Sequence, residues 1–339
     1  MEYVWLDGYE TPNLRSKVKV IEHNRHIRPL KLEDAPEWNF DGSSTKQAIG
    51  EKSECVLKPV RLYQTDHNNT VYVLCGVHDS DGNYHESNNR IKLSVAGLSC
   101  QNEVPGDNEF GFWWGFEQEY FMMAGLRPTG FPPGGYPKPQ GEYYCGIGYE
   151  NIKHRHLAEA HMHTCLEYGI EITGINAEVA LGQWEYQVFA RDTVRACDDL
   201  WMSRYLLHKM AESHQIRIDM SPKPIKGDWN GSGCHTNFSN HLMRGEENEA
   251  YFKRLLSNLE ERHQLHITAY GKQNEQRLTG DHETQHIGKF SWGVGDRGAS
   301  IRVPNSVASS GWIGYVEDRR PAANCDPYVV ARLVLEAAP

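Results

Sequence analysis

The chain lacks the features that would assign it to a membrane or a nucleic acid. No window of its 339 residues approaches the roughly 18 uninterrupted apolar residues of a transmembrane helix. Its first ten residues, MEYVWLDGYE, hold neither a basic region nor a long apolar one, which predicts no signal peptide. No run of Lys or Arg offers a stripe for phosphates, and the formal net charge is −10. We therefore expect no membrane and no nucleic acid as partners.

Clustered cysteines and the common nucleotide-binding loops are also missing. The eight cysteines are dispersed without a C-x-x-C pair, which favours free thiols in a reducing cytoplasm. Neither G-x-x-x-x-G-K-[ST] nor a G-x-G-x-x-G after a strand is present. We predict a cytoplasmic protein, and any nucleotide site in it must be of another kind.

Composition changes along the chain and predicts two domains. Residues 1–85 read as short strands rich in Val and Tyr, separated by turn signals such as Asp81-Gly82-Asn83. Residues 86–339 alternate helical and strand-like segments. Apolar spacing of three and four predicts helices over 154–169, 197–214 and 248–270, whereas the Pro- and Gly-rich segment 127–144 predicts an irregular loop.

Acidic residues on apolar, strand-like segments are the most informative feature. GFWWGFEQEYFMM carries Glu117 and Glu119, and GINAEVALGQWEYQVFA carries Glu178 and Glu185. Residues two apart on a strand share a face, so Glu117 and Glu119 would project together from a strand whose other positions are Trp, Phe and Tyr. Ionised carboxylates are costly there unless they are paired or bind a metal, although a single Glu is usually a surface residue.

Two further segments complete the proposed ligand set. His235 lies in CHTNFS and Glu317 in GYVEDRRP. Together with the four glutamates they form a hard, oxygen-rich set that suits Mg²⁺ or Mn²⁺. His235, Asn237 and Ser239 share one strand face; from these residues alone, a core histidine with polar neighbours is an equally good interpretation.

Arginines near the acidic segments indicate that the site binds phosphate or carboxylate groups. Arg302 lies in the strand-like run ASIRVP, and Arg319 is on the same predicted face as Glu317. A guanidinium fits phosphate and carboxylate oxygens with two parallel hydrogen bonds, although any one of these arginines could be a surface residue. Acidic metal ligands beside such arginines are typical of a phosphoryl-transfer site.

Three segments allow more than one interpretation. TGDHETQH resembles a mobile flap, in which Glu283 closes over a substrate or is an exposed loop residue. Asp41 in WNFDGSST is interpreted first as a turn residue. The histidines 154, 156, 161 and 163 are spaced too widely along one helix for a single metal ion, so we predict a solvated helix there.

Eight segments in order resemble the glutamine synthetase family, in particular its shorter type II form. The resemblance runs from about residue 5 to residue 328, and the segments that carry it are WNFDGSST, EQEY, PQGEYYCG, NAEV with QWEYQ, NGSGCHTNFS, RLTGDHET, ASIRVP and EDRRPAANCDP. The resemblance implies an α+β fold with an N-terminal β-grasp domain and a larger catalytic α/β domain, whose curved antiparallel sheet is of the glutamine synthetase/guanido kinase type. It also implies a homo-oligomer, a decamer of two pentameric rings, with Asp41 supplied by the neighbouring subunit.

The resemblance also implies roles for individual residues. One metal would be bound by Glu119, Glu178 and Glu185, and another by Glu117, His235 and Glu317, with two or three Mg²⁺ or Mn²⁺ ions per site. Substrate glutamate would be bound by Asn230, Gly231, Arg277, Arg297 and Arg319. ATP would be bound by Trp113, Asn237, Ser239, Arg302 and Tyr315. The expected catalytic residues are Asp41, Glu283, Arg297 and Arg319.

The expected reaction is ATP-dependent ligation of ammonia to the side chain of L-glutamate through γ-glutamyl phosphate. Two alternatives remain: a γ-glutamyl ligase for a small amine, and a catalytically silent ring-forming homologue. A regulatory sensor role could coexist with catalysis. The chain departs from the animal and plant pattern at Phe189-Ala190, where a Gly-Pro pair near the nucleotide is usual.

Overall fold

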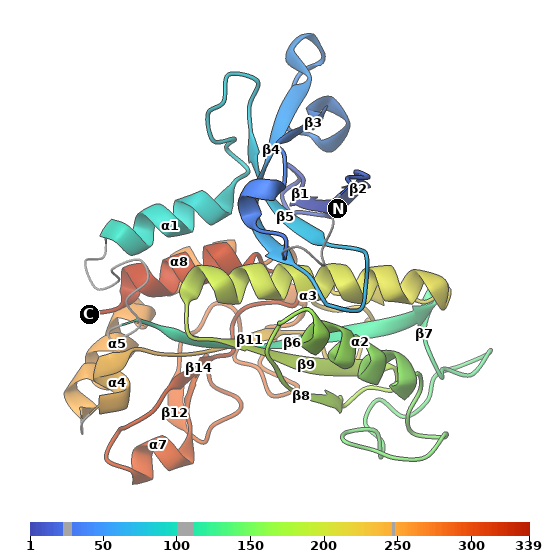
Figure 1. Ribbon diagram of the computed structural model, residues 1–339. Helices are drawn as coiled ribbons and strands as arrows, with labels where there is room; N and C mark the ends of the chain where they lie inside the picture. Colours follow the sequence, from blue (N-terminus) through green and yellow to red (C-terminus); the bar gives the residue numbers. More distant parts are fainter. Residues whose placement is uncertain (23–28, 100–110, 246–247) are drawn as a thin grey trace. The chain divides into compact units, whose positions relative to one another are not determined.

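The computed structural model describes residues 1–22, 29–99, 111–245 and 248–339, and these form two compact units (Figure 1). One unit comprises Met1–Val95 with Glu167–Gly169, and the other comprises Ala96–Leu166 with Ile170–Pro339. No helix in the described ranges is long and apolar enough to cross a membrane. The seven cysteines described are free thiols, whereas Cys100 lies outside the described residues.

The first unit contains a five-stranded mixed sheet in the order β2-β1-β5-β4-β3. The central pair β1 and β5 is parallel, and the other neighbours are antiparallel. The strands are β1 (Glu2–Leu6), β2 (Leu14–Val18), β3 (Trp38–Asp41), β4 (Glu54–Tyr63) and β5 (Tyr72–His78). Short 3₁₀ turns occur at Leu32–Asp34, Gly42–Thr45 and Gly50–Lys52, and helix α1 spans Asn89–Ser99.

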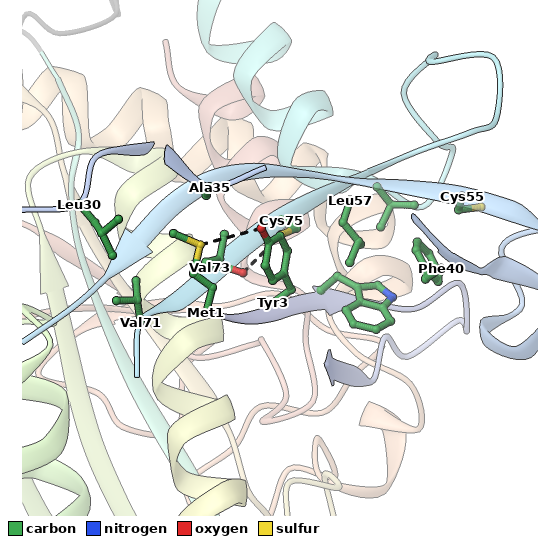
Figure 2. Packing of buried hydrophobic residues seen from close by; sticks show 12 residues of the cluster. Met1, Tyr3, Leu30, Ala35, Phe40, Cys55, Leu57, Val71, Val73 and Cys75 are labelled. Carbon is green, nitrogen blue, oxygen red and sulfur yellow. Dashed lines mark hydrogen bonds between the residues drawn. The ribbon is translucent and has the colours of Figure 1, made fainter. Parts of the chain in front are cut away.

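The hydrophobic core of this unit packs against one face of the sheet (Figure 2). Tyr3 and Trp5 point to that face because they are two apart on β1, and they join Leu57 and Val73 of the neighbouring strands. The Tyr3 hydroxyl donates to the Pro36 carbonyl over 2.6 Å, so its polar atom is satisfied. The predicted strand-rich character of this region is confirmed.

The second unit contains a larger sheet with the main order β12-β13-β14-β11-β6-β9-β8, while β7 and β10 also pair with β6. Its strands are β6 (Trp113–Ala124), β7 (Arg127–Pro128), β8 (Ile172–Ala177), β9 (Gln183–Ala190), β10 (Arg217–Asp219), β11 (Cys234–Ser239), β12 (Trp292–Val294), β13 (Ile301–Val303) and β14 (Val316–Asp318). The expected antiparallel sheet is therefore mixed, because β12 and β13 run parallel.

Helices accompany this sheet. They are α2 (Arg155–Glu167), α3 (Thr193–Ser213), α4 (His241–Gly245), α5 (Glu249–Glu261), α6 (His263–Ala269), α7 (Asn305–Ser309) and α8 (Pro327–Ala337), with a 3₁₀ turn at Asn274–Gln276. Helix α3 packs on β6, β9 and β10 and also against α8. The single helix predicted over 248–270 is two helices, because Arg262 departs from helical geometry with φ −93° and ψ 5°.

The prediction that the histidines of α2 face solvent is wrong for His161. His161 is fully buried: its Nε2 lies 2.9 Å from the Ser203 carbonyl of α3, and its ring packs edge-on against Tyr186. Burial lowers the pKa of His161 to about 4, so the ring is neutral at pH 7. His163, which points outward from the same helix, is exposed as expected.

Candidate metal and substrate site

Residues predicted to bind metal and substrate meet in one cavity of the second unit. Its volume is about 580 Å³. The predicted residues that line it are Glu117, Glu119, Glu178, Glu185, Asn230, Gly231, His235, Arg277, Glu283, Arg297, Arg302, Glu317 and Arg319. They come from segments as much as 202 positions apart, from Glu117 to Arg319, so the fold assembles the site from distant parts of the chain.

The strand register brings four of these side chains together. Glu117 and Glu119 share one face of β6. Across β11, His235 is directly opposite Glu117; across β9, Glu185 is directly opposite Glu119. Directly opposed residues have Cβ atoms about 4.5–5.5 Å apart, so pairing alone places these carboxylates and the imidazole within reach of one another.

The residue between the two glutamates anchors the strand on its other face. The Gln118 Oε1 accepts from Arg204 Nε of α3 over 2.8 Å, and Gln118 Nε2 donates to the carbonyls of Glu119 and Ala323. Arg204 also donates to the Cys325 carbonyl over 2.8 Å. This buried network ties β6 to the helix layer and holds the acidic face toward the cavity.

Glu117, His235 and Glu317 form a potential metal centre. Each offers one ligand atom, and these atoms all lie within 4.8 Å of one another. Among the residues that the structure describes, no other group of three His, Cys, Asp or Glu side chains meets this criterion. His235 Nδ1 is 3.3 Å from Glu117 Oε2 and 3.5 Å from Glu317 Oε1. Burial, with a smaller effect of Arg319, holds the pKa of His235 well below its usual value, so the imidazole is in the neutral form that binds metals.

Two arginines flank Glu317 and carry unused donors. Arg319 Nη1 donates to Glu317 Oε1 over 2.6 Å, and Arg302 Nη1 donates to Glu317 Oε2 over 2.8 Å. The Nε atoms of both arginines are buried and have no hydrogen-bond partner in the protein. Leaving a buried donor unsatisfied costs about 1–3 kcal/mol, so these N–H groups favour an anion in the cavity.

A second set of carboxylates lies in the same cavity. Burial is the main cause that raises the pKa of Glu119 to about 8, of Glu178 to about 7 and of Glu185 to about 9, and repulsion between neighbouring carboxylates adds to it. Two like charges 4 Å apart repel by about 4 kcal/mol at an effective dielectric of 20. A divalent cation removes this repulsion, so the donor set fits a hard ion such as Mg²⁺ or Mn²⁺.

Glu178 lies directly after β8, in the connection to β9, rather than on the predicted strand. Strand β8 ends at Ala177, and Gly182 takes the left-handed φ of +85° before β9 begins. The chain has to reverse between these two antiparallel strands, and this reversal removes Glu178 from the sheet. Its carboxylate is held by Asn176 Nδ2 and by the backbone N–H of Val179, both at 3.0 Å.

Backbone contacts fix the predicted glutamate-binding residues. Arg277 Nη2 donates to the carbonyls of residues 319–321 over 2.8–3.0 Å. Gly231 lies so close to this arginine that an added Cβ would be 2.5 Å from Arg277 Cγ and from the Pro222 carbonyl oxygen, so only glycine fits. Asn230 Oδ1 is buried and has no hydrogen-bond partner in the protein. Arg277 is thus held by the backbone, and Asn230 keeps an acceptor for a ligand.

The flap predicted around Glu283 has no helix or strand between residues 277 and 291. His282 and Glu283 are both left-handed, with φ of +52° and +58°. Such a backbone costs roughly 1–2 kcal/mol per non-glycine residue, so it needs support from its surroundings. Arg319 Nη2 donates to the Glu283 carbonyl over 3.3 Å, and Thr284 Oγ1 donates to the Arg277 carbonyl over 3.2 Å.

An aromatic cluster surrounds the first predicted ATP-binding residue, outside the cavity lining. Trp113 is paired with Ser239 across β6 and β11. Arg244 lies 4.0 Å from the Trp113 ring centre and donates to Ser239 Oγ over 2.9 Å. Arg191 lies 4.9 Å from the same ring, and Phe189 meets it edge-on with centroids 6.1 Å apart. The departure at Phe189-Ala190 therefore adds an aromatic ring beside Trp113.

Two other predicted ATP-binding residues also lie outside the cavity lining. Asn237 points toward the metal trio, because its Nδ2 donates to Glu117 Oε1 over 2.8 Å. Tyr315 directly precedes β14 and is 41% exposed. Their proposed contacts with nucleotide remain predictions.

Asp41 belongs to the first unit and begins a 3₁₀ turn, as its turn interpretation predicted. Its carboxylate accepts from the backbone N–H of Ser43 over 3.0 Å and from the hydroxyls of Ser43 and Ser44 over 2.6 Å. These hydrogen bonds hold the pKa of Asp41 below its usual value. The carboxylate is therefore an exposed anion, and its proposed role toward ammonium remains a prediction.

Several cavity residues were not selected from the sequence. They are Tyr144, Asn176, Val179, Gln187, His282 and Thr284. Gln187 is two residues after Glu185 on β9, so period-two alternation would have identified it. Asn176 precedes Glu178 by two in the same way, whereas no spacing signal indicated Tyr144.

Comparison with known proteins identifies the family. A family model described as the glutamine synthetase catalytic domain matches residues 101–269. A glutamine synthetase of Yarrowia lipolytica is 46% identical over 99% of this chain and 89% of its own length. A glutamine synthetase of Bradyrhizobium diazoefficiens is 46% identical over 99% of this chain and 95% of its own length. Glutamine synthetase 1, mitochondrial, of Drosophila melanogaster is 43% identical over 98% of this chain and 82% of its own length.

These matches extend over nearly the whole chain, and the cavity brings the segments that carry the resemblance into one place. The chain belongs to the glutamine synthetase family.

Proposed function

We propose that this protein is a glutamate–ammonia ligase that uses ATP to convert L-glutamate and ammonia into L-glutamine, with ADP and phosphate as the other products. Family membership supports this reaction. The structural observation that carries it is the cavity that six glutamates and His235 line together with arginines whose Nε–H groups have no hydrogen-bond partner in the protein. The activity is a carbon–nitrogen ligase reaction.

Divalent cations are part of this proposal. Glu119, Glu178 and Glu185 would hold one ion, and the trio Glu117, His235 and Glu317 would hold a second, with two or three Mg²⁺ or Mn²⁺ ions in each site. When bound, such ions neutralise phosphate charge and offset the repulsion among the glutamates. The buried carboxylates with raised pKa values support this assignment.

The arginines and the amide of Asn230 would act on the substrates. The unpartnered Nε donors of Arg302 and Arg319 point to charge stabilisation on the phosphoryl group as it moves from ATP to the glutamate side chain. Asn230, Gly231 and Arg277 would hold glutamate in place, and Arg297 would contact the activated carboxylate. The product of this step is γ-glutamyl phosphate.

Ammonia would then displace phosphate from this intermediate. We propose that Asp41 and Glu283 attract ammonium and that one of them accepts its proton, while Glu283 shields the acyl phosphate from water. Trp113, Asn237, Ser239, Arg302 and Tyr315 form the proposed ATP site. The Trp113 and Phe189 rings, which meet edge-on, would supply apolar surface to this proposed site.

The larger-scale features belong to the same proposal. We assign residues 1–85 to a β-grasp domain and residues 86–339 to a catalytic domain of the glutamine synthetase/guanido kinase type. We propose a decamer of two pentameric rings in which Asp41 reaches a neighbouring subunit's site, and a cytoplasmic location.

The decisive experiment measures phosphate release from ATP with Mg²⁺ and glutamate, with and without ammonium, and quantifies glutamine. The proposal expects sustained release only with ammonium, in equal amount to glutamine. Turnover with a small amine but not with ammonium would replace it by an amine ligase. No turnover with ammonium and none with a small amine would indicate a ring-forming homologue without catalysis.

A further inference from the structure

A chain of two amides links two glutamates of the cavity. Asn176 Nδ2 donates to Glu178 Oε1 over 3.0 Å, and Gln187 Nε2 donates to Asn176 Oδ1 over 3.1 Å. Gln187 Nε2 also donates to Glu185 Oε1. Asn176 and Gln187 both line the cavity, so the chain Glu178–Asn176–Gln187–Glu185 forms part of its wall.

The direction of every hydrogen bond in this chain is fixed. With a divalent cation bound, both glutamates are ionised and only accept hydrogen bonds, so the amide group that faces each of them has to be NH₂. Both hydrogens of Gln187 Nε2 are used, one for Glu185 and one for Asn176. A flip of the Gln187 amide would set its oxygen against two acceptor oxygens. The two amides therefore have one arrangement, and it holds one oxygen of each glutamate in place.

The backbone of β8 is shaped to admit the Gln187 amide. The register between β8 and β9 shifts at Thr173, which places Gly174 opposite Gln187. A Cβ on Gly174 would lie 2.4 Å from Gln187 Oε1, so the bulge and the missing side chain together leave room for the amide. Any larger residue at this position would push the amide away from Asn176 and Glu185.

We propose that Asn176 and Gln187 are positioning residues that orient Glu178 and Glu185 for one divalent cation. This inference depends on the proposed metal site formed by Glu119, Glu178 and Glu185. Neutral N–H donors suit the task, because they hold carboxylates at close range without neutralising the charge that the ion requires. Such supporting contacts to ligands are worth about 10–100-fold in metal affinity.

The test is a Mn²⁺ titration without ATP or glutamate, with free Mn²⁺ followed by electron paramagnetic resonance. The variants Gln187→Met and Asn176→Leu keep side-chain shape and remove the hydrogen bonds. Each is expected to weaken one class of Mn²⁺ site about 10–100-fold and to spare the class at the Glu117, His235 and Glu317 trio. The double variant is expected to lose little more than the larger single loss, because the two amides act as one chain.

Gly174→Ala provides an independent arm, since it displaces the amide while both amide residues and all ligands remain. It is expected to weaken Mn²⁺ binding at the same class of site. If the Gln187→Met or Asn176→Leu variant does not fold, Gly174→Ala alone tests the positioning role. Matched controls are Gln264→Met on the exposed face of α6 and Gly50→Ala, where an added Cβ meets no atom within 4 Å. Thermal unfolding of every variant separates lost affinity from lost stability.

The outcomes distinguish this inference from the proposed function. If the wild-type protein binds Mn²⁺ and every folded variant binds it with a dissociation constant within about twofold of the wild-type value, the positioning role is overturned and the metal centre stands. A wild-type protein without Mn²⁺ sites would overturn the proposed metal centre and the positioning role with it. A lower melting temperature with unchanged Mn²⁺ affinity would make the amides structural and would also overturn the inference.

Discussion

Arg319 Nη1 donates to Glu317 Oε1 over 2.6 Å, which makes this arginine a direct neighbour of a predicted metal ligand. Its other terminal nitrogen donates to the carbonyl of Glu283 in the flap over 3.3 Å. One planar guanidinium thus connects the metal centre with the segment expected to cover the substrates, and its buried Nε has no hydrogen-bond partner in the protein.

Arg319→Lys should lower kcat by about 10²–10³-fold. A lysine ammonium is a point charge on a flexible stem, so it cannot reach Glu317 and the flap carbonyl together and offers no fixed third donor. Loss of one preorganised donor in a reacting site costs about this much. Steady-state kinetics with glutamate and ammonium measure the effect, and Arg332→Lys on α8 is the control. Activity within threefold of wild type would remove Arg319 from the catalytic role.

Glu185→Ala should abolish one class of Mn²⁺ site and reduce glutamine formation by more than about 100-fold, because a metal that neutralises phosphate is lost. The Mn²⁺ stoichiometry and the coupled activity are measured on the same preparation. Glu159→Ala, at a half-exposed glutamate of α2 outside the cavity, is the matched control. Normal Mn²⁺ stoichiometry in Glu185→Ala would contradict the assignment of this ligand.

Asp41→Ala should raise the KM for ammonium by about tenfold, a change of about 1.4 kcal/mol, and leave the KM values for ATP and glutamate nearly unchanged. The reason is the loss of an exposed anion that would attract a cation. Asp41→Asn removes the charge but keeps the shape: the amide oxygen can still accept from Ser43, whereas the NH₂ group that replaces Oδ2 has to donate to the Ser44 hydroxyl. An unaltered ammonium dependence in both variants would leave Asp41 with a structural role only.

Metal removal should destabilise the protein more at pH 9 than at pH 6. Without an ion, the pKa of Glu185 is raised from its usual 4.5 to about 9 and that of Glu119 to about 8. The folded state therefore holds protons that the unfolded state has released, and stability falls as pH rises through this window. Melting temperatures with EDTA and with excess Mg²⁺ test this at both values. An equal effect of EDTA at pH 6 and pH 9 would contradict it.

Acid should destabilise the fold through His161. Its folded pKa of about 4 lies below the usual 6.5, so the unfolded state binds the proton more readily. The resulting stability is complete above pH 6.5 and falls as pH drops toward 4, by on the order of 3 kcal/mol. His161→Gln should reduce this pH dependence, whereas the exposed His163→Gln should not. Urea unfolding at pH 7.5 and pH 5 compares the three proteins.

Local periodicity predicted those site residues that lie on strands. Glu117 and Glu119 were placed on one face by the alternation of a strand, and the structure confirms both β6 and that shared face. Glu178 was misplaced on a strand because a turn between antiparallel strands carries no period, and the reversal at Gly182 depends on where β8 and β9 pair. Arg244 was missed because its contact with Trp113 joins segments 131 positions apart (244 − 113 = 131).

The sequence by itself determined the chemical types of the ligands, the order of the segments and the family, because these depend on residue identity and local spacing. Only the tertiary structure decided which side chains meet: the register of five neighbouring strands sets Glu119 opposite Glu185 and Glu317 opposite Arg302. It also decided that Gly174 opens the space for Gln187 and that His161 is buried against α3. These relationships depend on packing between distant segments, and no pattern along a single strand or helix contains that information.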